Sequence, residues 1–303
     1  MSGPVFLYYE LTNFYQNHRR YVKSRDDDQL AAGDSVSPSA SAYSSNCDPW
    51  VYSTYESSSG VSTDTQLYPC GLVARSVFND TFVLNGVSTD ESASTICWAQ
   101  DVSKKFSPAN PNLSVSGTPL IEQMDMWLLK TFPPQICVPI DPTTPPVYIP
   151  VNLITLDSGM QIVDCDFDAG TCNFANNACT GLYTAIANPA GWGLDNGHFI
   201  NWMRTAGLST FRKLYARIDQ SFEAGDVIRV GVQSNFPVTD YEGTKSIVLS
   251  TVNWAGGKNS FLGIAYIIVG SLTLIFTLVY AILHFKHPRR LIDIDYLDWG
   301  ESH

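Results

Sequence analysis

A long apolar run lies near the C-terminal end of the chain. Residues 261–285 (FLGIAYIIVGSLTLIFTLVYAILHF) contain no Asp, Glu, Lys or Arg. An α-helix rises about 1.5 Å per residue, so about 20 apolar residues cross the hydrocarbon core of a bilayer. A helix buried in a soluble core would show a polar stripe, whereas this run has only scattered Ser, Thr and Tyr. The pattern therefore predicts a transmembrane helix over residues 259–285.

The charges that flank this run predict its orientation. Lys286, Arg289 and Arg290 follow it, and Lys258 is the nearest cation before it. Because cytosolic flanks carry the excess of Lys and Arg, we expect residues 286–303 in the cytosol and residues 1–258 in the lumen or outside the cell. The opening residues, MSGPVFLYYE, have neither the basic nor the apolar region of a signal sequence. We therefore expect the native product to begin with a further membrane helix.

The N-terminal part contains a predicted strand, a charged segment and two loop-like stretches. An apolar and aromatic run from Val5 to Tyr15 predicts the strand. Residues 17–28 (NHRRYVKSRDDD) have the charge typical of a solvated face, and the Ser-rich residues 31–66 are typical of a loop. The Pro-rich residues 107–150 predict an ordered excursion on the surface.

A β pattern returns before the membrane segment. Ile228, Val230 and Val232 alternate with polar or small residues, which is the period of a half-buried strand. A turn at residues 240–243 (DYEG) separates this segment from a second predicted strand over residues 244–254. The two segments together predict a hairpin that ends at the membrane.

Charge and cysteine content narrow the function classes. The formal net charge of −11 argues against nucleic-acid binding, which needs clustered Lys and Arg. None of the seven cysteines forms a C-x-x-C motif, so we expect no structural zinc site. Two glycosylation sequons, Asn79-Asp80-Thr81 and Asn112-Leu113-Ser114, combine with the cysteines to favour an oxidising, glycosylating compartment. The odd cysteine count leaves at least one thiol free or paired outside the chain.

The acidic residues Asp164, Asp166 and Asp168 resemble the opening of a calcium loop. Ala175 stands where such a loop needs a bidentate Glu, so calcium is disfavoured. A disulfide-tied loop is the better interpretation of this segment, which also holds Cys165, Cys172 and Cys179.

Motifs for catalysis are missing from the sequence. Gly256-Gly257-Lys258 fails as a phosphate loop because Asn259 stands where Ser or Thr is required. His18 and His198 are the histidines that precede the membrane run, and a single histidine is more often structural than catalytic. We therefore predict that the chain is not an enzyme and needs no cofactor or metal.

Four stretches, in this order, resemble one protein family. They are YELTNFYQNHRRYVKSRDDD (residues 9–28), PCGLVARSVFNDTF (69–82), FINWMRTAGLSTFRKLY (199–215) and IVLSTVNWAGGKNSFLGIAYIIVG (247–270). They are similar to the ligand-effect modulator 3 / cell division control protein 50 family, whose members are β subunits of type-IV P-type ATPases, the phospholipid flippases. Family members have two transmembrane helices around the ectodomain, and this chain matches only the second.

The resemblance implies a fold class and covalent features. The fold is expected to be mainly β, an antiparallel β-sandwich-like ectodomain with short helices and long loops, plus the C-terminal transmembrane α-helix. Cys47 and Cys70 match a family disulfide. Its closure of a loop would stabilise the folded chain by about 3 kcal/mol. Asn79 is a candidate glycan site, the alternative being an unmodified asparagine in a turn, and Asn112 is a second candidate. The resemblance leaves five cysteines unassigned: Cys97, Cys137, Cys165, Cys172 and Cys179.

The resemblance also implies a partner and a role. The chain would form a heterodimer with the ATPase α subunit in the bilayer, and would support its exit from the endoplasmic reticulum, its stability and lipid flipping. The expected location is the membrane of the endoplasmic reticulum, Golgi, endosomes or the cell surface. The alternative is a free-standing single-span cell-surface receptor or adhesion ectodomain. Which ATPase and which lipid are involved stays open.

Small residues recur along the membrane run. Gly263, Gly270 and Thr277 are seven residues apart, so they fall near one face of a helix. Small residues let two helices approach closely in a membrane, where packing drives association. We expect this face to contact a partner helix; the alternative is that it faces lipid.

Overall fold

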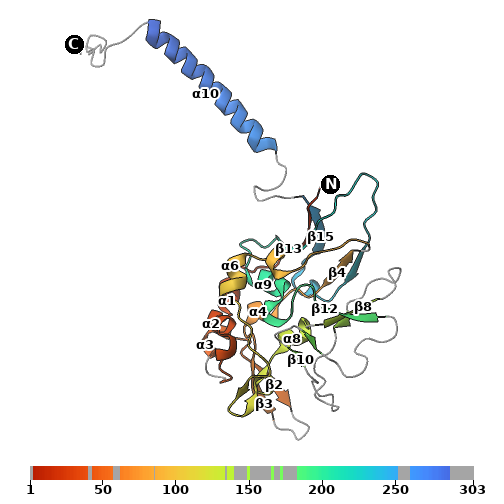
Figure 1. Ribbon diagram of the computed structural model, residues 1–303. Helices are drawn as coiled ribbons and strands as arrows, with labels where there is room; N and C mark the ends of the chain where they lie inside the picture. Colours follow the sequence, from red (N-terminus) through yellow and green to blue (C-terminus); the bar gives the residue numbers. More distant parts are fainter. Residues whose placement is uncertain are drawn as a thin grey trace, which may run out of the picture. The chain divides into compact units, whose positions relative to one another are not determined.

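The computed structural model describes residues 3–39, 43–56, 62–84, 86–133, 135–139, 149–150, 165–166, 171–172, 183–251 and 260–286. The chain divides into two compact units, residues 1–251 and residues 252–303. Figure 1 shows both, and each is described by itself below.

Short strands and short helices alternate along the first unit. Its strands are β1 (Val5–Leu11), β2 (Tyr52–Glu56), β3 (Ser62–Leu67), β4 (Thr81–Leu84), β5 (Ser114–Val115), β6 (Thr118–Pro119), β7 (Met124–Asp125), β8 (Gln135–Pro139), β9 (Ile149–Pro150), β10 (Cys165–Asp166), β11 (Thr171–Cys172), β12 (Tyr183–Ala187), β13 (Phe211–Ile218), β14 (Val230–Gln233) and β15 (Lys245–Ser250). Its helices are α1 (Arg19–Lys23), α2 (Asp27–Ala31), η1 (Gly33–Ser35), α3 (Ser44–Cys47), α4 (Leu72–Arg75), α5 (Ala93–Ile96), α6 (Ala99–Lys104), α7 (Leu120–Gln123), α8 (Trp127–Thr131), η2 (Gly193–Asp195), α9 (Gly197–Met203) and η3 (Thr239–Tyr241).

The N-terminal strand β1 is the middle strand of an antiparallel sheet with the order β13-β1-β15 (Figure 1). Its alternate residues, from Val5 to Leu11, are buried, and the residues between them are half-buried. The strand predicted from the sequence is confirmed, but it ends at Leu11 rather than at Tyr15. The reason is local, because Asn13 adopts a left-handed backbone conformation with φ 58°.

The predicted hairpin before the membrane segment is wrong. β14 pairs with β4, whereas β15 pairs with β1, so the two segments belong to different sheets. The turn between them packs against the end of β1, where the backbone N–H of Thr12 donates to the carbonyl of Thr244 (3.0 Å). The predicted alternation also fails at Val232, which is 50% exposed.

The other strands of the described residues form small sheets of two or three strands, ordered β10-β11, β12-β8-β9, β14-β4, β2-β3-β7 and β5-β6. The first unit is therefore a mainly β structure with short helices, as predicted, and the sandwich-like arrangement stays a prediction. In β10 and β11 the backbone register places Cys165 opposite Cys172. Cys179 lies outside the described residues.

Two stretches predicted as loops contain regular structure. The Ser-rich residues 31–66 include β2 and most of β3, which pair with each other, because Tyr, Thr and Val in this stretch favour strands. In the Pro-rich stretch, Leu120, Met124 and Leu128 are buried in the core, so this part is not a surface excursion. Residues 134 and 140–148 of that stretch lie outside the described residues.

Aromatic rings fill the core beside the β13-β1-β15 sheet. Trp202 of α9 is fully buried, and its indole N–H donates to the carbonyl of Val73 (2.8 Å). The Phe14 ring lies 5.6 Å from Trp202 and 6.0 Å from Phe236, centroid to centroid. Phe14 therefore anchors the segment after β1 to α9, although it lies outside the strand.

The second unit contributes the helix α10 (Ser260–Lys286). Residues Phe261–Lys286 have a mean hydropathy of 2.3 in their most apolar window, and the helix is long and apolar enough to cross a membrane. The predicted position of the apolar helix is confirmed. Beyond Lys286, the predicted cytosolic tail lies outside the described residues.

Candidate functional site

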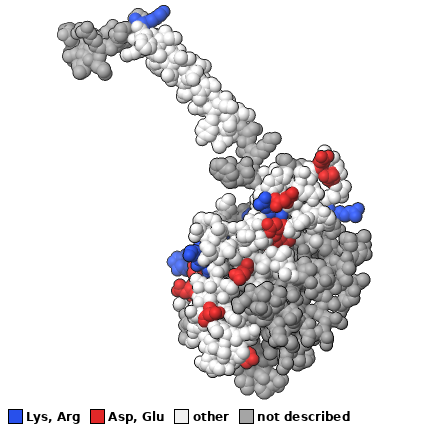
Figure 2. Space-filling view, viewed as in Figure 1, with Lys and Arg blue, Asp and Glu red and all other residues white. Residues whose placement is uncertain are grey.

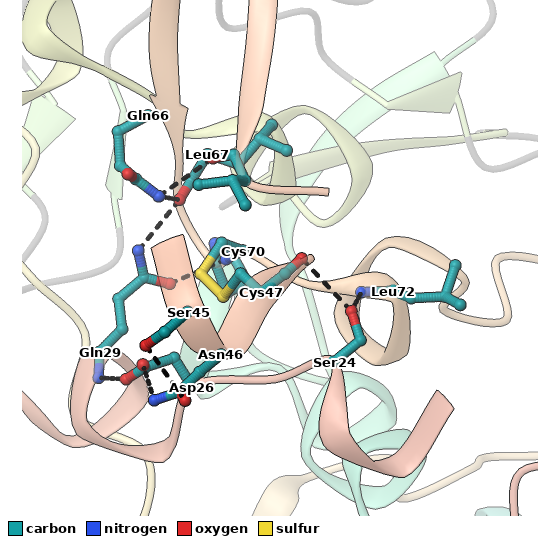
Figure 3. The surroundings of a disulfide bond; sticks show 12 residues. Ser24, Asp26, Gln29, Ser45, Asn46, Cys47, Gln66, Leu67, Cys70 and Leu72 are labelled. Atoms are coloured by element: carbon teal, nitrogen blue, oxygen red, sulfur yellow. Dashed lines mark hydrogen bonds between the residues drawn. A yellow bond between two sulfur atoms is a disulfide. The ribbon is translucent and has the colours of Figure 1, made fainter. Parts of the chain in front are cut away.

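Cys47 and Cys70 form a disulfide, with their Cα atoms 5.6 Å apart. Cys47 ends α3, and Cys70 precedes α4, so the bond joins two short helices that are far from each other in sequence. Both cysteines are buried, at 0% and 2% exposure. Figure 3 shows the polar side chains that surround the bond.

Buried polar side chains fix the backbone on both sides of the disulfide. The Gln29 amide donates to the carbonyl of Leu67 (3.0 Å) and accepts from the N–H of Cys70 (2.8 Å) (Figure 3). The Ser24 hydroxyl accepts from the N–H of Leu72 (2.8 Å) and donates to the carbonyl of Cys47 (3.3 Å). Hydrogen bonds satisfy backbone groups that burial would otherwise leave unpaired. The result is a rigid connection between α1, α2 and the disulfide.

The charged run 17–28 is therefore only partly a solvated face. Asp26 is 3% exposed, and its carboxylate accepts from the N–H of Gln29 and from the side chain of Asn46, each at 2.8 Å. Asp26 thus caps α2, a role that an acidic residue fills well at a helix start. This role was not predicted from the sequence, because Asp26 lies among other charged residues that suggested a solvated face. In the other part of the run, Arg19, Arg20 and Lys23 of α1 are exposed, whereas Tyr21 and Ser24 are buried.

The Asn79 sequon lies at the start of β4, with its middle residue buried. The Asp80 carboxylate accepts from the N–H groups of Asn235 and Phe236 (2.6 Å each) and lies 2.5 Å from the ammonium of Lys245. Asn79 itself is half-buried, and its carbonyl accepts from the side chain of Asn235 (3.0 Å). The sequon is thus tied to the segment that follows β14 and to Lys245 of β15. The second sequon is separate, and its Asn112 is exposed.

The histidine His198 lies in α9 and is tied to neighbouring elements. Its Nε2 lies 3.1 Å from the carboxylate of Glu91, and its ring stacks on Tyr215 with the centroids 4.2 Å apart. These contacts fix the ring in the packed interior, in line with the structural role expected from the sequence. His18 is exposed, far along the chain from this pair.

Lys213 was not singled out in the sequence, yet it closes the end of α9. It is only 6% exposed, and its ammonium donates to the carbonyls of Asn201 (2.7 Å), Trp202 (3.2 Å) and Arg204. Burial, followed by the nearby charge of Arg204, lowers the pKa of Lys213 to about 7. Carbonyls at a helix C-terminus favour a charged ammonium, so these hydrogen bonds oppose the lowering of the pKa of Lys213. No local pattern marks a lysine of β13 as a cap of α9, the element before it.

On α10 the predicted small-residue face carries further polar side chains. Gly263, Gly270 and Thr277 share the seven-residue spacing with His284, and Tyr266, Thr273 and Tyr280 follow at the intervening turns. The hydroxyl of Thr277 donates to the carbonyl of Thr273 within the helix (2.8 Å). Both glycines have open space where a Cβ would lie. The helix therefore presents one seam of small and polar residues. The glycine spacing in the sequence predicted only part of this seam.

Comparisons with known proteins identify one family. Residues 1–290 match the profile of the LEM3 (ligand-effect modulator 3) family / CDC50 family. Putative ALA-interacting subunit 2 of Arabidopsis thaliana is 33% identical over 291 residues, which cover 95% of this chain and 63% of that protein. Cell cycle control protein 50A of Bos taurus is 36% identical over 299 residues, 94% of this chain and 65% of that protein. Cell cycle control protein 50B of Homo sapiens is 35% identical, over 94% of this chain and 68% of that protein.

The chain belongs to the LEM3/CDC50 family, because the match covers nearly its whole length and includes both units. The resemblance seen in the four sequence stretches is thereby confirmed. The chain spans 63% of the length of the Arabidopsis relative and 65% of the bovine one.

Proposed function

We propose that this chain is the non-catalytic accessory (β) subunit of a phospholipid-translocating type-IV P-type ATPase. In this role it supports the exit of the ATPase from the endoplasmic reticulum, its stability and its lipid flipping. The observation that carries the proposal is the family match over residues 1–290. The names of several relatives, such as ALA-interacting subunit 3, describe them as subunits that interact with another protein.

The two units would divide this role between them. α10 anchors the chain in the bilayer and packs with its seam of small and polar residues against the ATPase. The first unit lies on the lumenal or extracellular side, and the tail after Lys286 lies in the cytosol, as the flanking charges favour. The assembly would reside in the endoplasmic reticulum, Golgi, endosomes or the plasma membrane. The partner supplies ATP hydrolysis, so this chain contributes surface rather than catalysis.

The first test is purification of the tagged chain from eukaryotic membranes in a mild detergent. We expect a P-type ATPase, identified by mass spectrometry, to be recovered with the chain in about equal amounts, because the heterodimer is stable in the membrane. Recovery of the chain alone, with the size of a single copy, would contradict the proposal. That outcome would favour the free-standing receptor or adhesion ectodomain.

The second test concerns the glycans and the side of the membrane. We expect N-glycosidase treatment of the chain to lower its apparent mass, because Asn112 is exposed and Asn79, just before β4, is only half-buried. The substitutions Asn79→Gln and Asn112→Gln should each remove one of the mass steps seen on a gel. A mobility that neither the enzyme nor the substitutions change would argue against a lumenal first unit.

A further inference from the structure

Cysteines are the reactive side chains that the proposed function leaves without a role. On the described part of the face in Figure 2, acidic and basic side chains are interspersed rather than gathered into patches of one sign, so charge alone marks no ligand site on it. Besides Cys47 and Cys70, five cysteines remain: Cys97, Cys137, Cys165, Cys172 and Cys179. Because thiols at bonding distance become disulfides in an oxidising compartment, the arrangement of these five decides which of them pair.

Two of these cysteines lie directly opposite each other in the antiparallel strand pair β10-β11. The backbone register pairs Cys165 with Cys172, and Asp166 with Thr171. Opposite residues of an antiparallel pair have Cα atoms about 4.5 Å or about 5.5 Å apart, depending on whether the two residues exchange hydrogen bonds. Both separations fall within the range of about 4.4–6.8 Å that disulfides span. The register therefore gives the backbone of this pair the spacing of a disulfide.

The thiol of Cys97 is held elsewhere. Its Sγ donates to the carbonyl of Gly197 in α9 (3.0 Å), and the thiol is free. Burial raises the pKa of Cys97 to about 12, so the thiol stays protonated at neutral pH. Because the thiolate is the form that enters disulfide exchange, Cys97 is a poor partner for the other cysteines.

The strand neighbours of Cys137 are not cysteines. Cys137 lies in β8, the middle strand of its sheet, where it is opposite Ala185 of β12 and Ile149 of β9. Cys179 lies outside the described residues. Among the described strands, Cys165 and Cys172 are therefore the one pair of cysteines that the register places opposite each other.

We propose that Cys165 and Cys172 form a second disulfide, which closes the β10-β11 hairpin. The inference rests on the lumenal or extracellular position of the first unit in the proposed function, because a thiol oxidant is needed there. One thiolate of the pair attacks the disulfide of a protein thiol oxidant and forms a mixed disulfide, and the second thiolate then displaces the oxidant. One sulfur–sulfur bond forms in this chain and one breaks in the oxidant, which takes up the two electrons and two protons as a dithiol.

The bond would stabilise a hairpin that backbone pairing alone holds weakly. β10 and β11 have two residues each. A two-stranded hairpin is at best marginally stable in water, even when its strands are longer. A disulfide restricts the unfolded forms of the segment between its two cysteines, so the paired state is favoured.

The test is peptide mapping of the full chain made in eukaryotic cells, with free thiols alkylated at lysis and no reducing agent added. Cleavage before Asp168 and after Phe174 separates the three cysteines of this segment from one another. We expect the fragment that contains Cys165 to be joined to the fragment that contains Cys172. Alkylation of these two thiols should be about tenfold lower before reduction than after it, because structural disulfides resist the thiols of their compartment.

Two variants sharpen the test. Cys165→Ser removes one partner, so Cys172 should become a free thiol whose alkylation before reduction rises about tenfold. Cys97→Ala is the matched control, because it removes a thiol that is not part of the pair, and it should leave the bond intact. The Cys47–Cys70 disulfide in the same digest shows independently whether the chain reached an oxidising compartment.

The outcomes separate this inference from the proposed function. A joined Cys47–Cys70 pair with free thiols at Cys165 and Cys172 would overturn the inference and leave the proposed function standing. A bond from either cysteine to Cys179, or to a second copy of the chain, would overturn the inference too. If both pairs are free, the first unit is not in an oxidising compartment, and the inference and the proposed function both fail. If the second disulfide is found but no ATPase is recovered with the chain, the proposed function fails and the inference stands.

Discussion

Replacing Gly71 with Ala is expected to destabilise the first unit by about 3 kcal/mol, which lowers its melting temperature by about 6–12 °C. Gly71 has φ 99°, a conformation that side chains rarely adopt. A Cβ added there would lie 2.4 Å from the carbonyl oxygen of Ser24 and 3.0 Å from the Cα of Arg25. Both are backbone atoms, so no side chain can rotate away. The measurement is the thermal unfolding of the purified chain, followed by near-ultraviolet circular dichroism.

A glycine in a different setting provides the control. Gly207 has open space where a Cβ would lie, and it is not among the glycines with positive φ. Gly207→Ala should therefore change the melting temperature by less than about 2 °C. Equal melting temperatures for Gly71→Ala and the unaltered chain would show that the segment after the disulfide can move away from α1.

Replacing both Gly263 and Gly270 with Leu is expected to lower the amount of ATPase recovered per chain by about tenfold. The two glycines leave open space along the seam of α10, and leucine would fill it with side chains that keep a partner helix at a distance. Hydropathy and membrane insertion should be preserved, since leucine favours the bilayer core. The measurement is the molar ratio of co-purified ATPase to this chain.

The control for the seam is the double substitution Leu272→Ile and Leu283→Ile, at positions outside the glycine row. It should leave the ratio unchanged, because the side chains keep their volume and the seam keeps its shape. Unchanged recovery in the glycine double variant would mean that the seam faces lipid. The first unit would then have to hold the complex without help from this face.

The parts of the fold that sequence patterns predicted are those with local signals. β1 has a period of two over seven residues, and α10 has an uninterrupted apolar run, and both are present. The predicted hairpin failed because strand pairing is not local. Nothing in residues 228–254 indicates that β14 joins β4 and β15 joins β1, each more than a hundred residues away.

The candidate site shows the same difference between features with local sequence signals and features that depend on distant segments. The Cys47–Cys70 pair was expected only from the family resemblance, since seven cysteines allow many pairings by sequence alone. Ser24 and Gln29 were missed because each binds backbone groups that the fold brings from distant segments. Lys213 was missed because it turns back onto the helix that precedes its own strand. A polar residue in a polar run gives no sign that it will be buried. The exposed cations of α1, by contrast, were visible in the sequence as charge, but their lack of a partner within the described residues needed the structure.

The position of β1 between β13 and β15 has a consequence for synthesis on the ribosome. β1 is made before β15, and at about 5–20 residues per second β15 follows it by about 10–50 seconds. During that interval one edge of β1 displays unpaired N–H and C=O groups, the kind of edge to which other chains add. β15 is made immediately before α10, so the edge closes only as the membrane helix itself emerges. Translation order thus leaves the nascent first unit open to chaperones until its anchor is ready to enter the bilayer.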